Sequence, residues 1–248
     1  GNVVDPLDVV DEYGADALRF SLVTGVTPGQ DVPLSMERVK VNRNFCNKLW
    51  NAARFLEPKM VSSGGVIDEK ELSEMPLFER YIISEAHACA EASASALEDY
   101  SIGDAGTRAY RFFYDEFADW YVEVSKTRSE EDQAASQRAL SYSFEVCLKL
   151  LHPFVPHVTE FLWQKLFNSA GDDKALMNEA YPSIEGNTLA QDAEAVALFN
   201  DWKELVRAMR NIRAEYNIEP AIKTGPTIIC SDDALADVIR RETKALAL

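Results

Sequence analysis

Residues 43–55 read RNFCNKLWNAARF, and two stripes of different chemistry recur in and beside this stretch at helical spacing. The apolar stripe consists of Val39, Cys46, Leu49, Ala53 and Leu56, and the polar stripe consists of Asn44, Asn47, Lys48, Asn51 and Arg54. Residues three and four positions apart share one face of an α-helix, so the pattern predicts a helix with one packed face and one exposed face. Amide and guanidinium groups can hydrogen-bond nucleobase edges because each holds its hydrogen-bonding groups in a plane.

The rest of the sequence predicts a series of helices. Caps, glycines, prolines and apolar periodicity predict helices over residues 6–13, 16–22, 36–57, 77–98, 104–125, 131–151, 155–167 and 190–216. The stretches 59–74 and 168–188 are expected to be an exposed connector and a loop. Residues 227–230 predict a short strand and residues 234–247 a helix. Short connections favour antiparallel neighbours, so we expect a mainly α fold, an antiparallel helix bundle with a short terminal α/β element.

Composition is that of a globular protein. The 248 residues are 47% hydrophobic, which is enough for one large domain or two small ones. No run of about 18 apolar residues occurs, and the start resembles no leader, so we expect neither a membrane span nor a targeting peptide. The cysteines, Cys46, Cys89, Cys147 and Cys230, are far apart and predict reduced thiols.

The net charge of −16 argues against nucleic-acid binding, because phosphate contacts normally depend on cations. Exposed charges are screened over about 8 Å at physiological salt, so a local patch can still bind a polynucleotide. An alternative reading of the acidic composition is a non-enzymatic helical adaptor that recruits basic proteins.

Neither a metal site nor a catalytic site is expected in this chain. The three histidines, His87, His152 and His157, are scattered, and no CxxC pair occurs. There is no glycine-rich phosphate loop after a strand, and no nucleophile has a plausible base and orienting group. The sequence therefore predicts no cofactor within these residues.

The stretch 43–55 resembles the RNF-x-NK-x-WNA-x-RF helix that opens the anticodon-binding domain of valyl-tRNA synthetases. Residues 1–22 resemble the segment that directly follows the KMSKS signature of that family. Three later blocks continue the resemblance, FFYDEFADWYVEVSK at 112–126, LHPFVPHVTEFLWQKL at 151–166 and RNIRAEYNIEP at 210–220. The last block and residues 112–128 look most similar to bacterial and organellar forms. The isoleucyl, leucyl and methionyl enzymes are alternatives, although NK-x-WNA-x-RF favours valine.

The resemblance implies a C-terminal fragment of a class I valine-tRNA ligase. Its parts would be the end of the stem-contact region of the catalytic core (1–35), a helical anticodon-binding domain (36–218) and the start of a small, truncated α/β element (219–248). The intact enzyme would use ATP and Mg²⁺ in an upstream domain that this chain lacks. The implied partners are tRNA(Val) and that catalytic domain, with no membrane contact, and the implied state is a soluble monomer in the cytoplasm, a chloroplast or a mitochondrion.

The resemblance also implies roles for individual residues. Asn51 and Arg54 are the first candidates for anticodon contact, and Asn44, Asn47 and Lys48 are weaker ones. The alternative for this row is an ordinary solvated helix face. 

Trp120 either stacks on an anticodon base, by analogy with the methionyl enzymes, or lies in the core. Arg207, Arg210 and Arg213, spaced three apart, either contact the tRNA backbone or pair with acidic neighbours such as Glu204 and Glu215. Arg19 is expected to form a structural ion pair with Asp16.

Overall fold

The fold is an assembly of α-helices. The computed structural model describes residues 4–25, 34–61, 65–168, 174–182, 190–219, 222 and 224–247. The α-helices are α1 (Pro6–Tyr13), α2 (Ala15–Val23), α3 (Met36–Leu56), α4 (Glu69–Glu74), α5 (Leu77–Glu98), α6 (Ile102–Arg111), α7 (Val122–Ser125), α8 (Gln133–Leu151), α9 (Pro156–Leu166), α10 (Ala193–Glu215) and α11 (Asp233–Arg241). Shorter or irregular helical segments are η1 (Glu57–Lys59), η2 (Phe112–Tyr121), η3 (Leu176–Asn178) and η4 (Ala245–Ala247). Of the helices in these ranges, none is long and apolar enough to cross a membrane.

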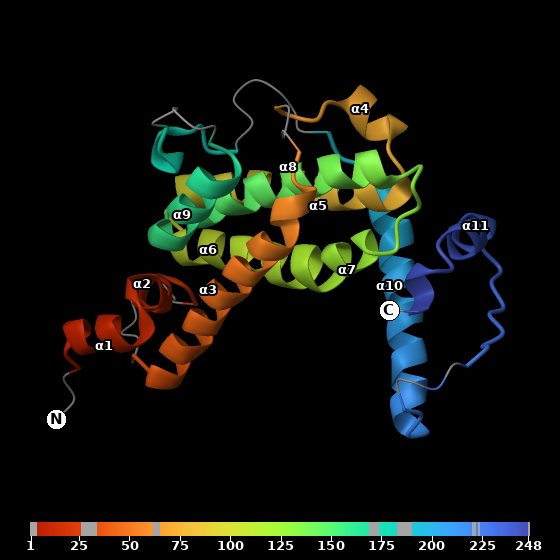
Figure 1. Cartoon of the computed structure of the whole chain (residues 1–248), viewed down its shortest axis with the longest axis horizontal. Coiled ribbons are helices and arrows are strands. Elements are labelled where there is room, and N and C mark those ends of the chain that lie inside the picture. The colour runs from red at the N-terminus through yellow and green to blue at the C-terminus, as the bar shows by residue number, and fades with distance from the viewer. Residues whose placement is uncertain are drawn as a thin grey trace.

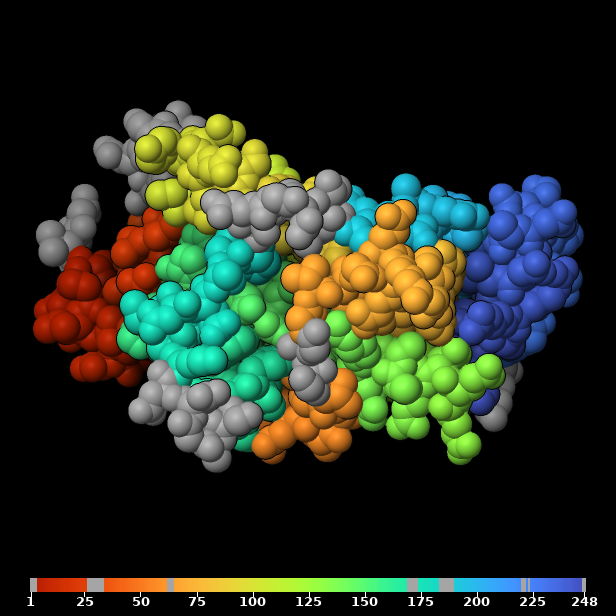
Figure 2. Space-filling view, turned by 90° about the horizontal axis from the view of Figure 1, so that it is seen from above, coloured from red at the N-terminus to blue at the C-terminus, as the bar shows by residue number. Residues whose placement is uncertain are grey.

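A bundle built on α5 forms the centre of the molecule (Figure 1). Helix α5 packs against α6, α8 and α10, while α9 packs on α8. Helix α3 crosses the bundle obliquely and joins it to the small unit formed by α1 and α2 (Figure 1). Figure 2 shows that these N-terminal helices and the C-terminal element lie at opposite ends of an elongated molecule.

The first helices begin where their capping residues predict. The carboxylate of Asp5 accepts a hydrogen bond from the Leu7 amide at 2.8 Å, with Pro6 at the first helical position. Gly14, at φ 90°, separates α1 from α2 in a backbone conformation that other residues rarely adopt. Ser35 caps α3 by accepting from the Arg38 amide at 3.5 Å.

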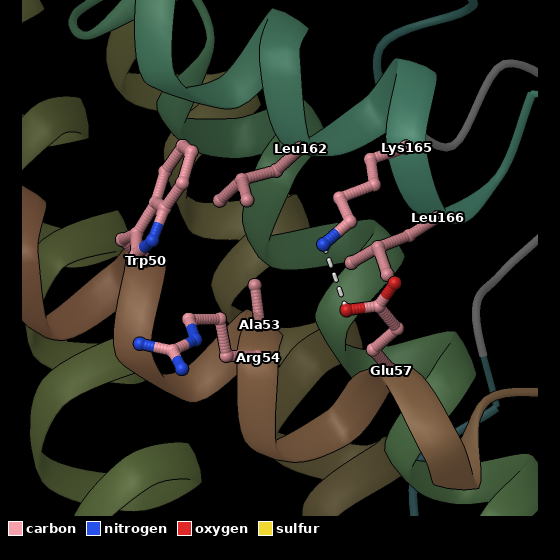
Figure 3. Close-up of a pocket in the computed structure, with 7 residues that line it drawn as sticks. All are labelled: Trp50, Ala53, Arg54, Glu57, Leu162, Lys165 and Leu166. Atoms are coloured by element: carbon pink, nitrogen blue, oxygen red, sulfur yellow. Dashed lines mark hydrogen bonds and ion pairs between the residues drawn. The ribbon is translucent and has the colours of Figure 1, made fainter.

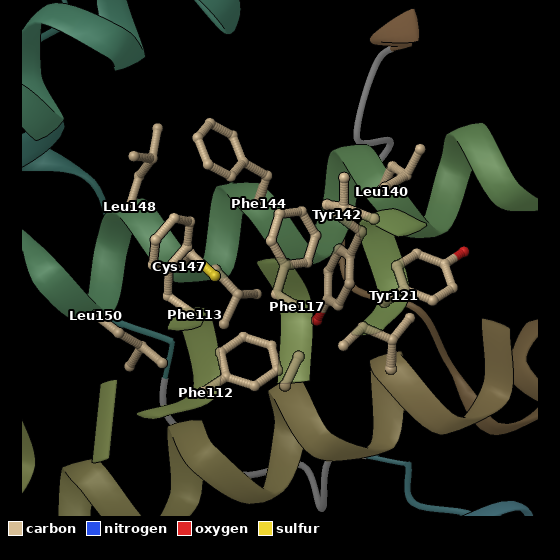
Figure 4. Close-up of a cluster of buried hydrophobic side chains, with 14 of the residues drawn as sticks. Phe112, Phe113, Phe117, Tyr121, Leu140, Tyr142, Phe144, Cys147, Leu148 and Leu150 are labelled. Atoms are coloured by element: carbon tan, nitrogen blue, oxygen red, sulfur yellow. The ribbon is translucent and has the colours of Figure 1, made fainter. Parts of the chain in front are cut away.

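The predicted helix over 104–125 contains an irregularity that the sequence does not reveal. Residues Phe112–Tyr121 form a π-helical stretch between α6 and α7. Its wider turns hold Phe113, Phe117 and Tyr121, four residues apart, in the core. The Phe117 ring stacks on Phe144 of α8 with centroids 5.7 Å apart, as Figure 4 illustrates.

A carboxylate from α2 caps α9 across the fold. Asp16 accepts hydrogen bonds from the backbone amides of His157, at 3.2 Å, and Val158, at 2.7 Å. The ion pair predicted between Asp16 and Arg19 is not formed; the Arg19 guanidinium donates instead to the Pro153 carbonyl at 3.2 Å. Both side chains therefore hold α2 against the start of α9.

The connector predicted over 59–74 is more structured than expected. It contains α4, whose start is capped by the Asp68 carboxylate accepting from the Glu71 amide at 2.8 Å. The preceding Ile67 and the helical Leu72 are buried in the main core. Their burial depends on tertiary packing, which explains why the polar sequence around them predicts a loop.

The strand predicted over 227–230 is wrong. Residues 224–230 form no regular secondary structure, and Ile229 is 96% exposed. A strand needs a neighbour to satisfy its backbone groups, and no strand occurs in the part of the chain that the structure describes. The helix predicted over 234–247 is observed as the shorter α11, which a turn separates from η4.

Candidate nucleic-acid interface

Helix α3 is oriented by the residues that it buries. Val39, Leu49, Ala53 and Leu56 of the predicted apolar stripe are buried, and Cys46 is partly buried. Two further residues are buried, Phe45, whose ring stacks on that of Phe20 at 5.2 Å, and Asn42, whose amide donates to the hydroxyl of Ser21 at 2.7 Å. This packing turns the opposite side of α3 toward solvent.

The predicted outward orientation of the polar row is confirmed. Asn44, Asn47, Asn51 and Arg54 are all exposed. Among the residues that the structure describes, the side chains of Asn47, Asn51 and Arg54 have no hydrogen-bond or ion-pair partner, whereas Asn44 accepts a long hydrogen bond of 3.4 Å from Arg43. Three planar polar groups are therefore available to an external ligand.

Lys48 differs from the rest of the row because it is engaged within the fold. Its ammonium nitrogen lies 2.6 Å from a carboxylate oxygen of Asp119 and 3.1 Å from the centroid of the Tyr114 ring. Asp115 lies in the same acidic stretch, and burial, together with the nearby Glu116, raises its carboxyl pKa. The positive charge of Lys48 is thus partly neutralised by its own protein.

Trp120 lies in the core rather than on an open surface. Its side chain is 7% exposed, and its ring meets that of Trp202 edge to face, with centroids 5.9 Å apart. The guanidinium carbons of Arg207 and Arg210 lie 5.4 and 5.3 Å from the ring centroid. Stacking on a base would require these two arginines to move.

The three candidate arginines of α10 make different contacts within the protein. Arg207 pairs with Glu204 at 2.5 Å, one of the acidic partners considered for it. Arg213 donates to the Thr224 hydroxyl at 3.0 Å and to the carbonyls of Glu219, at 2.7 Å, and Ile222, at 3.1 Å. Arg213 therefore holds the segment that follows α10 against the end of the helix.

An aromatic pair beside the polar row could not be predicted from the sequence. The indole of Trp50 stacks on the ring of Phe161 in α9 with centroids 4.8 Å apart and an interplanar angle of 29°. The two side chains remain 37% and 53% exposed. Trp50 lies three residues after Asn47 and four before Arg54, so its place on this face was visible in the sequence, but its partner in α9 was not.

Figure 3 shows the surface between α3 and α9 next to Trp50. Trp50 and Arg54 border one side of a shallow depression whose floor includes Ala53 and Leu162. At the other side, the Lys165 ammonium pairs with the Glu57 carboxylate at 2.8 Å. The depression thus combines apolar, aromatic and cationic groups.

Metal-binding chemistry finds no support in the ranges that the structure describes. No group of three or more His, Cys, Asp or Glu side chains is placed there to hold a metal ion. His87 is fully buried, with Nδ1 2.5 Å from the Ala190 carbonyl oxygen and Nε2 2.7 Å from the Tyr142 hydroxyl. Burial lowers the pKa of this imidazole, which favours a neutral core histidine.

The fold is of the type found in class I aminoacyl-tRNA synthetases. It is similar to LeuRS from Agrobacterium radiobacter, solved in a ternary complex with tRNA and LeuAMS, with a TM-score of 0.53 and 21% sequence identity. The similarity covers 77% of this chain and 23% of that one. The sequence profile of the anticodon-binding domain of tRNA ligase matches residues 79–228, and the chain belongs to this family.

Curated relatives of the chain are valine-tRNA ligases. The chloroplastic/mitochondrial enzyme 2 of Arabidopsis thaliana is 39% identical over 264 residues, which cover 100% of this chain and 26% of the relative. The enzyme of Carboxydothermus hydrogenoformans is 36% identical, covering 100% of this chain and 28% of the relative. That of Listeria innocua is 40% identical, covering 88% and 24%. The chain thus spans about a quarter of the length of these relatives.

Proposed function

We propose that the chain is the tRNA-anticodon-binding part of a valine-tRNA ligase and that it binds the anticodon loop of tRNA(Val) through the exposed row on α3. The observation that carries the proposal is that Asn51 and Arg54 are exposed on α3 without partners among the described residues. The match of the family profile and the valine-tRNA ligase relatives support it.

In this proposal the chain positions the tRNA and takes no part in the chemical reaction itself. ATP and Mg²⁺ would act in the catalytic part of the whole protein, which would be the chain's other partner, and the protein would act as a monomer in the cytoplasm or in an organelle. Binding at the anticodon would hold the distant acceptor end of the tRNA in register with the reacting groups.

The packing follows the proposed division of the chain only in part, because Phe20 of the first part lies in the main core and Val39 of the second part packs with the first. Val9, Ala17, Leu18 and Val39 form a small hydrophobic cluster of their own, separate from the main core. Residues 1–35 would belong with the stem-contact region, 36–218 would form the anticodon-binding domain, and 219–248 would begin a further element.

The negative net charge limits the kind of contact that this site can make. With a charge of −16, the affinity must come from a few local groups rather than from a general attraction to phosphate. The dependence of binding on salt should therefore be shallow, because its slope counts the phosphates that cations neutralise.

The decisive experiment compares two tRNAs. Binding of tRNA(Val), and of the same tRNA with a substituted anticodon, is measured for the unchanged chain and for Asn51→Ala and Arg54→Ala. Loss of a well-formed contact to a base edge costs about 1–3 kcal/mol, or roughly 5- to 150-fold in affinity. We expect such a loss for tRNA(Val) and a much smaller one for the substituted tRNA.

The matched control is Arg240→Ala, since Arg240 is 74% exposed on α11, at the other end of the molecule. It should leave both affinities unchanged. Equal losses for both tRNAs would make the row a nonspecific contact, and equally tight binding of isoleucine, leucine or methionine tRNA would reject valine as the cognate amino acid.

A further inference from the structure

The stacked pair of Trp50 and Phe161 is an unusual surface feature. Trp50 is 37% exposed, whereas the three other tryptophans, Trp120, Trp163 and Trp202, are 7%, 7% and 0% exposed. Its partner Phe161 is 53% exposed. Stacking has therefore covered only part of both rings, and aromatic surface from two different helices is presented together to solvent.

A purely structural role explains this pair only in part. Aromatic contacts add some stability beyond the area that they bury, and here they link α3 to α9. Other groups also join α3 to α9 about a turn away. The buried side chains of Ala53 and Leu162 line the same depression, and Lys165 forms an ion pair with Glu57. The exposed remainder of the rings adds nothing to that link.

The groups beside the rings match the chemistry of a nucleobase. Arg54, four residues after Trp50, lies on the same side of α3 and borders the same depression (Figure 3). Its guanidinium has no hydrogen-bond or ion-pair partner within the described ranges. Asn51, also exposed, directly follows Trp50. An unpaired base offers an apolar face to aromatic rings and a polar edge to guanidinium and amide groups.

We propose that Trp50 and Phe161 form a stacking platform for one unpaired nucleobase of an RNA loop, with Arg54 binding the edge of the stacked base. This inference rests on the proposed function and deepens it, because it moves the binding site from α3 alone to the junction of α3 and α9. Stacking supplies affinity without charge, which suits a chain of net charge −16.

Intrinsic fluorescence of the full chain tests the platform directly. Because Trp50 is the most exposed of the four tryptophans, an RNA base stacked on it should quench part of the emission. The probe is an RNA hairpin carrying the valine anticodon loop, with binding followed separately by the anisotropy of a label on its stem. We expect quenching that saturates together with the anisotropy and that disappears in Trp50→Phe.

Affinity changes give the second readout. Trp50→Leu and Phe161→Leu should each weaken hairpin binding by about 5- to 150-fold, the equivalent of 1–3 kcal/mol per stacked base. Trp50→Phe retains a ring and should bind more tightly than Trp50→Leu. The control is Tyr216→Leu, since Tyr216 is a 71% exposed aromatic at the C-terminal end of α10 rather than on α3 or α9. It should not change the affinity.

An abasic scan of the hairpin loop identifies the stacked base. Removing one particular base should weaken binding to the unchanged chain and should have little further effect on Trp50→Leu, since the two changes delete the same contact. The effect of the missing base on the unchanged chain and the quenching do not need a leucine variant, so they still test the platform if such a variant folds poorly.

The possible failures are distinct. A hairpin that binds by anisotropy without quenching, and with equal affinity for the leucine variants, would overturn the platform and leave the proposed function standing. A hairpin and tRNA(Val) that both fail to bind would overturn the proposed function and the platform together.

Discussion

Arg128 and Glu242 form a two-point ion pair that holds the end of α11 against the bundle. The Nη2–Oε2 distance is 2.6 Å and the Nη1–Oε1 distance is 3.2 Å. The two side chains are only 2% and 9% exposed. A second carboxylate, that of the fully buried Glu79, lies 3.6 Å from the same guanidinium, which also lies over the Phe78 ring. The Arg128 guanidinium is therefore close enough to interact with two buried carboxylates.

Replacing Arg128 by Met should strongly destabilise the chain. Removing one partner of a buried ion pair costs about 3–5 kcal/mol because the other charge stays buried without compensation. Urea unfolding at neutral pH measures the loss. The control Arg240→Met removes an arginine that pairs with Asp237 at the surface and should change the free energy of unfolding by no more than about 0.5 kcal/mol. Equal effects for the two variants would mean that the buried pair adds no stability.

Glu79 should make stability depend on pH in an unusual direction. Burial raises the pKa of its carboxyl from 4.5 to about 7, despite the opposing influence of Arg128 and a hydrogen bond from Tyr121. A carboxyl whose pKa is higher in the folded chain binds more protons when folded, so its contribution to stability falls as pH rises between the two values.

The matched variant for this effect is Glu79→Gln, which keeps the shape and cannot ionise. We expect the free energy of unfolding of the unchanged chain, relative to the variant, to decrease from pH about 4.5 to about 7 and then to level off. Urea titrations across this range provide the measurement. A difference that increases with pH would show instead that the ionised carboxylate is favoured by Arg128.

The cap that α2 provides to α9 should be worth a measurable amount. Asp16→Ala removes the acceptor for the amides of His157 and Val158 in the first turn of α9, and replacing a side chain that caps a helix N-terminus by Ala costs about 0.5–2 kcal/mol. The exposed Asp11 of α1 supplies the control, since Asp11→Ala removes the same charge without a known contact. Thermal unfolding of the two variants should separate clearly, and coincident curves would rule out a stabilising cap.

Much of the fold follows from local pattern, for identifiable reasons. Asp5 and Ser35 cap α1 and α3, and the spacing of Leu49, Ala53 and Leu56 decides which face of α3 is buried. Caps and periodicity involve residues within one or two turns of each other, so a single sequence reveals them. For the same reason, the outward orientation of Asn51 could be predicted.

Features that depend on distant partners could not be predicted. The ring of Phe161 meets Trp50 only because α9 folds back onto α3, and Trp120 is covered by arginines from α10. Similarly, the apolar run at 227–230 has the composition of a strand but finds no strand to pair with in the described part of the chain. Such contacts join segments whose separation along the sequence carries no information about their proximity.

The ion pair between Lys48 and Asp119 leads to a prediction about affinity. Its two side chains are 27% and 50% exposed, and the acidic group competes with RNA for the lysine. Asp119→Asn should therefore release Lys48 and remove a negative charge beside the polar row. Since exposed pairs are worth about 0.2–1 kcal/mol, we expect tRNA(Val) to bind roughly 1.4- to 5-fold more tightly at low salt.

The gain should disappear at high salt, because the Debye length shortens to about 3 Å at 1 M. Asp237→Asn is the control, because it removes the same charge from α11, which lies at an end of the molecule away from α3. Equal gains for both variants would indicate a general effect of net charge. Weaker binding by Asp119→Asn would show that Asp119 holds Lys48 in the position that the RNA requires, and the pair would then belong to the binding site rather than compete with it.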